Sequence, residues 1–195
     1  MEKTMKNKFL ILILLMIGCS SCEEENYIPK PKGYSRIDFP VHEYLRFSED
    51  CPFEFEYGKA SHYVYVQGKN NTTCWFNLEY PQLKATVLFS YLDIKKGNIS
   101  NYIKETRKLA LKHLSKADDF EENIVVDKEA KVYGVIYDFK GSTASNMQFY
   151  LTDSVNHFVR GALYFEVTPK ADSLGPSEQY VEEELKHLIE TFTWK

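Results

Sequence analysis

The sequence VYGVIYDFKGSTASNMQFYLTDSVNHFVRGALYFEV, from Val132 to Val167, decides the fold of this chain. It contains three runs rich in β-branched and aromatic residues, which are Val132–Phe139, Met147–Thr152 and His157–Val167. Such runs are typical of strands. The connections between them, Gly141–Ser145 and Asp153–Asn156, are short and polar. We therefore expect three successive strands joined as antiparallel hairpins.

Four earlier segments also have the pattern of strands. Cys51–Tyr57 alternates rings with carboxylates, as a half-buried strand does, and Tyr63–Val66 and Cys74–Tyr80 are shorter. Lys84–Tyr91 is the strongest of the four, and its alternate positions define one apolar face, formed by Ala85, Val87, Phe89 and Tyr91.

Two segments show the apolar spacing of helices. The first starts near Ile99, where Asn98 or Ser100 can cap it, and it carries Lys112 and Lys116 in its last turns. The second follows a loop at Thr168–Pro176, and its apolar stripe consists of Val181, Leu185, Leu188, Ile189 and Phe192. The tail at Thr193–Lys195 can return as a short edge strand.

The order of these elements predicts the α+β class, with an antiparallel sheet flanked by two main helices. The layout resembles the PsbP-like α/β/α sandwich, in which one helix follows the early strands and another ends the chain. This resemblance concerns the fold, and a shared fold does not carry a shared activity.

The N-terminus has the layout of an export signal. Three lysines at positions 3, 6 and 8 precede the unbroken apolar run Phe9–Ile17, which is too short to span a membrane. A cysteine then stands at the cleavage point, which resembles the lipobox of bacterial lipoproteins. The alternative is an ordinary secretory signal followed by a structural cysteine.

Two cysteines compete as the lipidated residue. Cys19 follows a small residue, Gly18, whereas Cys22 follows Ser20-Ser21 and also fits the lipobox. We assign residues 1–22 to the signal peptide and lipobox, 23–36 to an acidic and then Pro/Lys-rich linker, and 37–195 to a single globular α+β domain. The acidic run Glu23–Glu25 is either a surface-export signal or a solvated tether.

The charge balance excludes two classes of partner. The whole chain has a formal charge of −4, and the signal carries three lysines and one glutamate, a net +2, so the mature chain is near −6. A mildly acidic chain without a basic stripe is not expected to bind nucleic acid, nor a membrane by charge. Its hydrophobic content of 44% and aromatic content of 15% indicate a folded core.

Cys51 and Cys74 remain after the signal. Export would place them in an oxidising compartment, where a disulfide can persist. Closing the loop between them would stabilise the fold by about 3 kcal/mol in the chain-entropy model. The alternative is two buried free thiols. Without CxxC spacing or clustered histidines, the two cysteines do not indicate a zinc site.

Signatures of enzymes are missing from the sequence. It has no GxSxG, no HExxH, no phosphate-binding glycine loop and no EF-hand loop. The histidines are scattered, at positions 42, 62, 113, 157 and 187, and none is spaced as a ligand pair. Carboxylate runs such as Asp118-Asp119 and Glu182–Glu184 are typical of solvated faces. We therefore expect no enzyme activity, and no catalytic, cofactor or metal site.

Longer strings of residues point to one family. IPKPKGYSRIDFP (28–40) stands behind the lipobox, and CPFEF (51–55) and CWFN (74–77) follow it. Later come YGVIYD, QFYLTDS, HFVRGALYF and, at the C-terminus, ETFTWK. In this order the strings resemble the gliding motility lipoprotein GldD family of Bacteroidetes, and the resemblance covers essentially the whole mature chain.

The resemblance implies a non-enzymatic component of the gliding motility and type IX secretion apparatus. It implies a protein anchored by lipid (palmitate among its acyl chains) in the cell envelope, in the outer membrane, with other envelope proteins of that apparatus as partners. In the family, the cysteine nearest the PKPKG string is the usual lipid acceptor, which favours Cys22. Exposed rings and Arg160 are the contact residues we expect. A small-ligand or lipid-binding lipoprotein is the alternative, and an unrecognised hydrolase is a third.

Overall fold

The structure is a computed structural model that describes residues 38–66, 74–94, 98–166 and 171–195. The predicted signal peptide and linker, residues 1–36, and both candidate lipidation cysteines lie outside the described residues. The strands before the first described helix are β1 (Tyr44–Phe47), β2 (Phe53–Gly58), β3 (His62–Tyr65), β4 (Phe76–Tyr80) and β5 (Ala85–Asp93). The remaining elements are α2 (Ile99–Ala110), the 3-10 helix η1 (Leu111–Lys116), β6 (Asp119–Asp127), β7 (Val132–Lys140), β8 (Met147–Thr152), β9 (His157–Phe165), α3 (Ala171–Glu190) and β10 (Thr193–Trp194).

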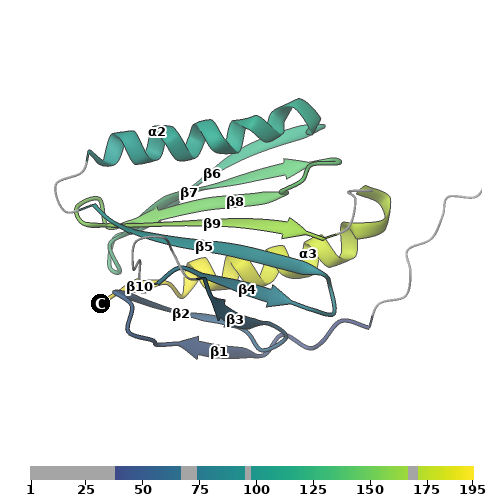
Figure 1. Ribbon diagram of the computed structural model, residues 1–195, viewed down its shortest axis with the longest axis horizontal. Coiled ribbons are helices and arrows are strands. Elements are labelled where there is room, and N and C mark those ends of the chain that lie inside the picture. The colour runs from purple at the N-terminus through teal and green to yellow at the C-terminus, as the bar shows by residue number, and fades with distance from the viewer. Residues whose placement is uncertain (1–37, 67–73, 95–97, 167–170) are drawn as a thin grey trace, which may run out of the picture. The chain divides into compact units, whose positions relative to one another are not determined.

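The described strands form two sheets in which every pairing is antiparallel. Seven of them are arranged in the order β3-β4-β5-β9-β8-β7-β6, and three in the order β1-β2-β10. Helix α2 lies on one face of the seven-stranded sheet, which we call the outer face, and α3 and the small sheet lie on the other, the inner face (Figure 1). The predicted α+β class, with an antiparallel sheet and two main helices, is confirmed.

Aromatic side chains fill the space between the inner face and the small sheet. Phe76 is 0% exposed, and its ring centroid lies 4.9 Å from that of Phe89 and 4.8 Å from that of Phe47. All five residues of the predicted stripe, four on α3 and Phe192 just after it, are buried in the same core. Gly161 is required beside this core, because a Cβ there would lie 2.2 Å from the ring of Phe149.

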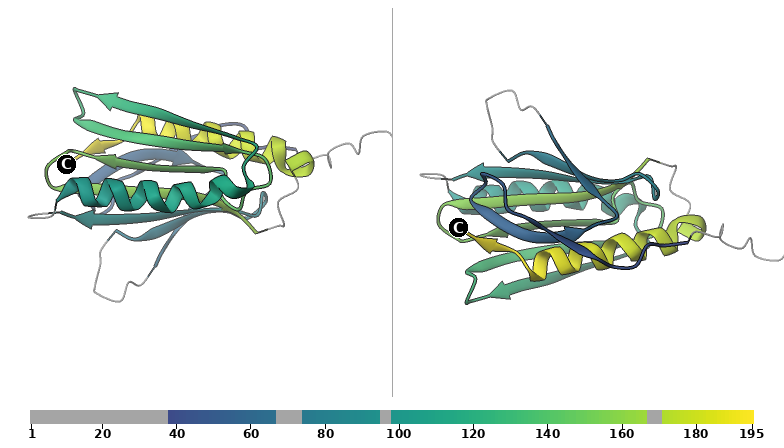
Figure 2. Two further views of the ribbon diagram at one scale, coloured as in Figure 1. Left: turned by 90° about the horizontal axis from the view of Figure 1, so that it is seen from above. Right: turned by 90° about the horizontal axis from the view of Figure 1, so that it is seen from below.

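Helix α2 begins where a side chain caps it. Asn98 Oδ1 accepts a hydrogen bond from the Ser100 N–H at 3.0 Å, so Asn98 is the cap of the two candidates. A separate apolar cluster lies beneath α2 and η1, formed by Ile94, Ala110, Tyr137, Phe139, Tyr150 and Phe158. These residues come mainly from β7, β8 and β9, so the helix covers only that half of the outer face (Figure 2).

The structure differs from the sequence-based expectation in four elements. The first expected helix, with Lys112 and Lys116 in its last turns, ends at Ala110 and continues as the 3-10 helix η1. Strands β1 and β6 were not predicted: β1 has four residues, and β6 contains four carboxylates that hide its alternation. Helix α3 begins at Ala171, so Pro176, which we placed in a loop, lies inside the helix. Proline there removes a single backbone hydrogen bond, while the apolar stripe that follows packs on the core.

Candidate functional site

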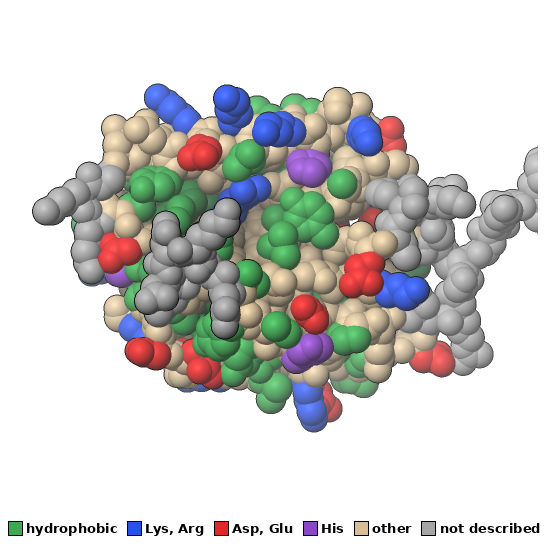
Figure 3. Space-filling view, in the orientation of Figure 1, with side chains coloured by type: hydrophobic (Ala, Val, Ile, Leu, Met, Phe, Trp, Pro, Cys, Tyr) green, Lys and Arg blue, Asp and Glu red, His purple; other side chains and the backbone are tan. Residues whose placement is uncertain are grey.

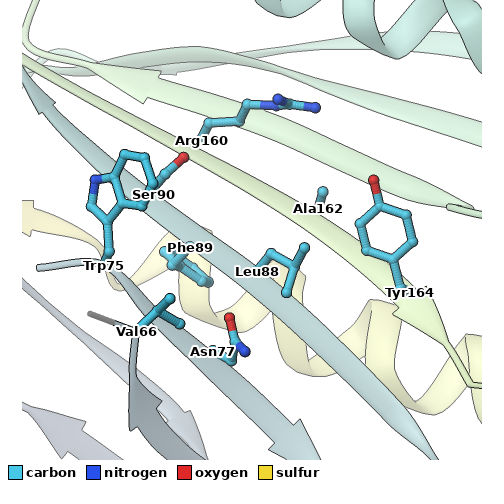
Figure 4. Close-up of a pocket in the computed structure, with 9 residues that line it drawn as sticks. All are labelled: Val66, Trp75, Asn77, Leu88, Phe89, Ser90, Arg160, Ala162 and Tyr164. Atoms are coloured by element: carbon cyan, nitrogen blue, oxygen red, sulfur yellow. The ribbon is translucent and has the colours of Figure 1, made fainter. Parts of the chain in front are cut away.

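The half of the outer face that α2 leaves uncovered contains a groove of about 450 Å³. We call it the outer groove, and it is lined by Val66, Trp75, Asn77, Leu88, Phe89, Ser90, Arg160, Ala162 and Tyr164 (Figure 4). Hydrophobic side chains are exposed on this face of the molecule (Figure 3). The groove is formed mainly by three adjacent strands, β4, β5 and β9.

Trp75 forms one wall of the outer groove and is held from two sides. Its indole N–H donates to the Tyr91 carbonyl at 2.7 Å, and its own carbonyl accepts from the Val66 N–H at 2.9 Å. The preceding residue, Cys74, is joined by a disulfide to Cys51, which lies just before β2. Because both neighbours of Trp75, Cys74 and Phe76, are buried, its ring is directed to the outer face.

Small side chains make the floor of the groove. Leu88 on β5 stands opposite Ala162 on β9, and Ser90 stands opposite Arg160 in the same pair of strands. Because Ala162 and Ser90 are short, a hollow remains between Trp75 and the longer side chains of β9. Leu88 projects into this region with 44% of its surface exposed, although it lies on a central strand.

Arg160 provides the only charge among the residues that line the groove. One of its terminal nitrogens, Nη2, donates to Gln148 Oε1 at 3.1 Å, and its buried Nε has no hydrogen-bond partner in the described residues. No carboxylate among the described residues forms an ion pair with the Arg160 guanidinium. The pKa of His113, which lies in η1, is lowered mainly by burial and to a smaller extent by the positive charge of Arg160. Arg160 is half-buried, and no carboxylate of the described residues balances its charge.

Of the expected contact residues, the structure places Arg160 at this groove, together with the half-buried rings of Trp75 and Tyr164. Leu88 was missed. A signal for it exists, because Leu88 is an apolar residue on the opposite side of the strand from the predicted apolar face of β5.

A second group of polar side chains surrounds Glu184 on α3. The Glu184 side chain has no exposed surface, and its carboxyl group forms a hydrogen bond with the His42 ring. The His42 ring stacks on Tyr180 at 4.5 Å. Gly58 leaves room for the carboxylate, because a Cβ there would lie 1.4 Å from Glu184 Oε2. Burial and the nearby Glu184 charge raise the pKa of Tyr180 to about 12 and also raise that of Tyr80.

This Glu184 cluster combines the residue types of acid–base chemistry but not the access that a substrate needs. A shallow cleft of about 250 Å³ touches His42 and Tyr180, yet Glu184 does not line it. The carboxylate is sealed between α3 and the end of β2. Its contacts instead attach the segment before β1 to α3, so the arrangement is that of a structural contact.

The other histidines lie apart from one another. His157 shares a hydrogen bond of 2.8 Å with the Tyr91 hydroxyl, His187 lies 2.8 Å from Glu56, and His62 lies 3.5 Å from Glu79. Among the described residues, no three His, Cys, Asp or Glu side chains are arranged to hold a metal ion. No helix in the same residues is both long enough and apolar enough to cross a membrane.

The fold and the outer groove define a class: an α+β sandwich domain with a partly uncovered sheet face. Its family follows from the sequence, because the family model described as "Gliding motility lipoprotein GldD" matches residues 24–194. The chain belongs to this family of gliding motility lipoproteins. Family membership implies a protein attached by lipid in the cell envelope and involved in gliding motility.

One solved structure resembles the fold of this chain. The solution structure of cyanobacterial PsbP (CyanoP) from Synechocystis sp. PCC 6803 has 10% sequence identity and a TM-score of 0.47, over 83% of this chain and 98% of that chain. No curated protein matches the chain by sequence.

Proposed function

We propose that this protein is a non-enzymatic component of the gliding motility and type IX secretion apparatus and that it acts through protein–protein contacts. The observation that carries the proposal is the outer groove, where Leu88 and Val66 are exposed beside a rigid Trp75. Aromatic and arginine side chains around exposed aliphatic residues are typical of the centre of protein interfaces.

The chemistry of the groove limits the partner. Its single charge is the Arg160 guanidinium, and its remaining lining is apolar or neutral. The occupant that fits is a segment of a partner protein that presents a carboxylate next to an apolar side chain. The carboxylate would pair with Arg160, and the apolar side chain would cover Leu88.

We further propose that lipid attached at Cys19 or Cys22 anchors the protein in the outer membrane, with residues 23–36 as a spacer. The disulfide between Cys51 and Cys74 fits an oxidising compartment outside the cytoplasm. The mass of the mature N-terminal peptide tests the anchor, because modification at Cys19 leaves three more residues on the peptide than modification at Cys22.

The alternative, a small-ligand or lipid-binding protein, has less support. It requires a deep pocket against the sheet, yet the space over the inner face is filled by the aromatic core. An enzymatic role has less support as well, because the buried Glu184 cannot be reached by a substrate.

The proposal is tested by complementing a deletion strain. Deletion should stop the release of type IX cargo into the medium, and in a gliding host it should stop spreading on agar. The variant pair Leu88→Ser and Arg160→Gln, combined, should fail to restore cargo release while the protein accumulates normally. Val155→Ser is the matched control, because Val155 is 67% exposed but lies in the β8–β9 turn, outside the groove. Normal cargo release in the deletion strain would refute the proposed function.

A further inference from the structure

Strand β6 forms a free edge of the seven-stranded sheet. Its nine residues pair with β7 in one unbroken register, from Asp119 opposite Lys140 to Asp127 opposite Val132. On its other side, β6 has no partner strand among the described residues. The opposite edge of the sheet, β3, has only four residues, so β6 is much the longer of the two edges.

The backbone groups that β6 presents outward can be assigned. Phe120 stands opposite Phe139, but the Phe120 N–H donates to Asp119 Oδ1 at 2.8 Å, and the Phe139 N–H donates to the Asn146 carbonyl on the other side of β7 at 2.8 Å. This pair is therefore not bonded between β6 and β7. Since bonded and non-bonded pairs alternate in antiparallel sheets, Glu122, Ile124 and Val126 also direct their N–H and C=O groups outward.

The second half of this edge lacks the features that usually protect an edge strand. Natural edges are shielded by proline, by a bulge or by inward-pointing charges. Here the aliphatic run Ile124-Val125-Val126 has none of these, and Ile124 and Val126 are 79% and 57% exposed. A groove of about 340 Å³ between β6 and α3 adjoins the same residues, and both views of Figure 2 show α3 beside the β6–β7 hairpin.

The charges around the edge determine what can bind there. Residues 118–127 contain five carboxylates and no lysine or arginine, and the adjoining α3 groove adds the carboxylate of Glu190 and one cation, Lys186. Glu122 is paired with Arg107 at 2.8 Å, whereas Glu121, Asp127 and Glu190 of α3 form no ion pair within the described residues. A second copy of β6 would place like charges opposite one another, which disfavours pairing between two copies.

We propose that the β6 edge binds an extended segment of a partner protein by strand addition, and that this segment alternates apolar and basic residues. Its backbone would bond to Glu122, Ile124 and Val126. Its apolar side chains would cover Ile124 and Val126, and its basic side chains would approach the carboxylates of Asp127 and Glu190 beside the α3 groove. This contact extends the proposed function, and its binding test does not depend on that function.

The test uses the full-length lipidated protein in detergent micelles and a labelled peptide of alternating lysine and valine that is long enough to cover the nine residues of β6. We expect saturable binding and slower hydrogen exchange at the amides of Glu122, Ile124 and Val126. A peptide of the same composition with its lysines and valines in separate blocks should bind about ten-fold more weakly, because it cannot satisfy both faces of the edge.

Two variants separate strand addition from simple charge attraction. Ile124→Pro removes an outward N–H while leaving the bonds to β7 intact, and it should weaken binding about ten-fold or more. Ile124→Thr, which keeps the N–H, should lose less. If Ile124→Pro lowers the melting temperature of the protein, the binding test is repeated with Val126→Pro, which removes another outward N–H.

Equal binding of the alternating and block peptides, or binding unchanged by proline, would overturn the proposal, as would self-association of the protein through this edge. The Leu88 variant in cells tests the proposed function separately, because Leu88 is not on β6.

Discussion

The two faces of the seven-stranded sheet are covered to different extents. Over the inner face, α3 and the small sheet enclose a continuous aromatic core. On the outer face, α2 and η1 cover mainly β7, β8 and β9, and no other described segment covers the outer groove beside them. Successive residues of one strand therefore have different tasks: Phe89 contributes to the core, whereas Leu88 is exposed. This difference separates residues that stabilise the fold from residues available for binding.

The largest effect is expected from truncating the inner face. Phe76→Ala should lower the free energy of unfolding by about 3–5 kcal/mol, because it leaves a cavity among stacked rings. Leu88→Ala should cost less than about 1 kcal/mol, because that side chain is already partly in water. Denaturant unfolding of both variants measures the difference, and equal losses would contradict the distinction between the faces.

The disulfide should have the next largest effect. Replacing Cys51 and Cys74 together with alanine should cost about 3 kcal/mol, because the unfolded chain loses a cross-link over 23 residues. The same variant should loosen the Trp75 wall of the outer groove, which thermal unfolding and tryptophan fluorescence can follow. If a reducing agent does not change the unfolding of the wild-type protein, the disulfide does not contribute to its stability.

A smaller effect is expected from Glu182 of α3. Burial raises the pKa of its carboxyl, with Lys140 opposing the shift and Asp138 adding to it. The pKa of this carboxyl is higher in the folded state than in the unfolded state. The fold therefore loses stability as the pH rises from the unfolded-state pKa through the folded-state pKa, and it stays less stable at higher pH. Glu182→Gln should therefore raise the melting temperature by about 1–2 °C at pH 7 and have no effect near pH 4. Glu190→Gln, at an exposed position, is the control and should change little.

The elements that the sequence predicted are those with local signals. The hairpins of residues 132–167, the strand before Asp93 and the stripe on α3 are readable from alternation and helical spacing. Strand β6 was missed because its carboxylates resemble a solvated run, and it becomes a strand through pairing with β7. The position of the outer groove depends on how much of the outer face of the sheet α2 packs against. That boundary is set by packing between distant segments, so Arg160 was anticipated but its neighbour across the groove, Leu88, was not.

Site-specific photo-crosslinking in living cells tests most directly whether the outer groove is a protein contact. A photoreactive residue at position 88 should give discrete crosslinked products, identified by mass spectrometry as other envelope proteins of the motility and secretion apparatus. The same residue at position 155 should give none of these products, since Val155 is exposed but lies outside the groove. Identical products from both positions, or none from position 88 in cells that secrete normally, would contradict a role for the groove in binding partners.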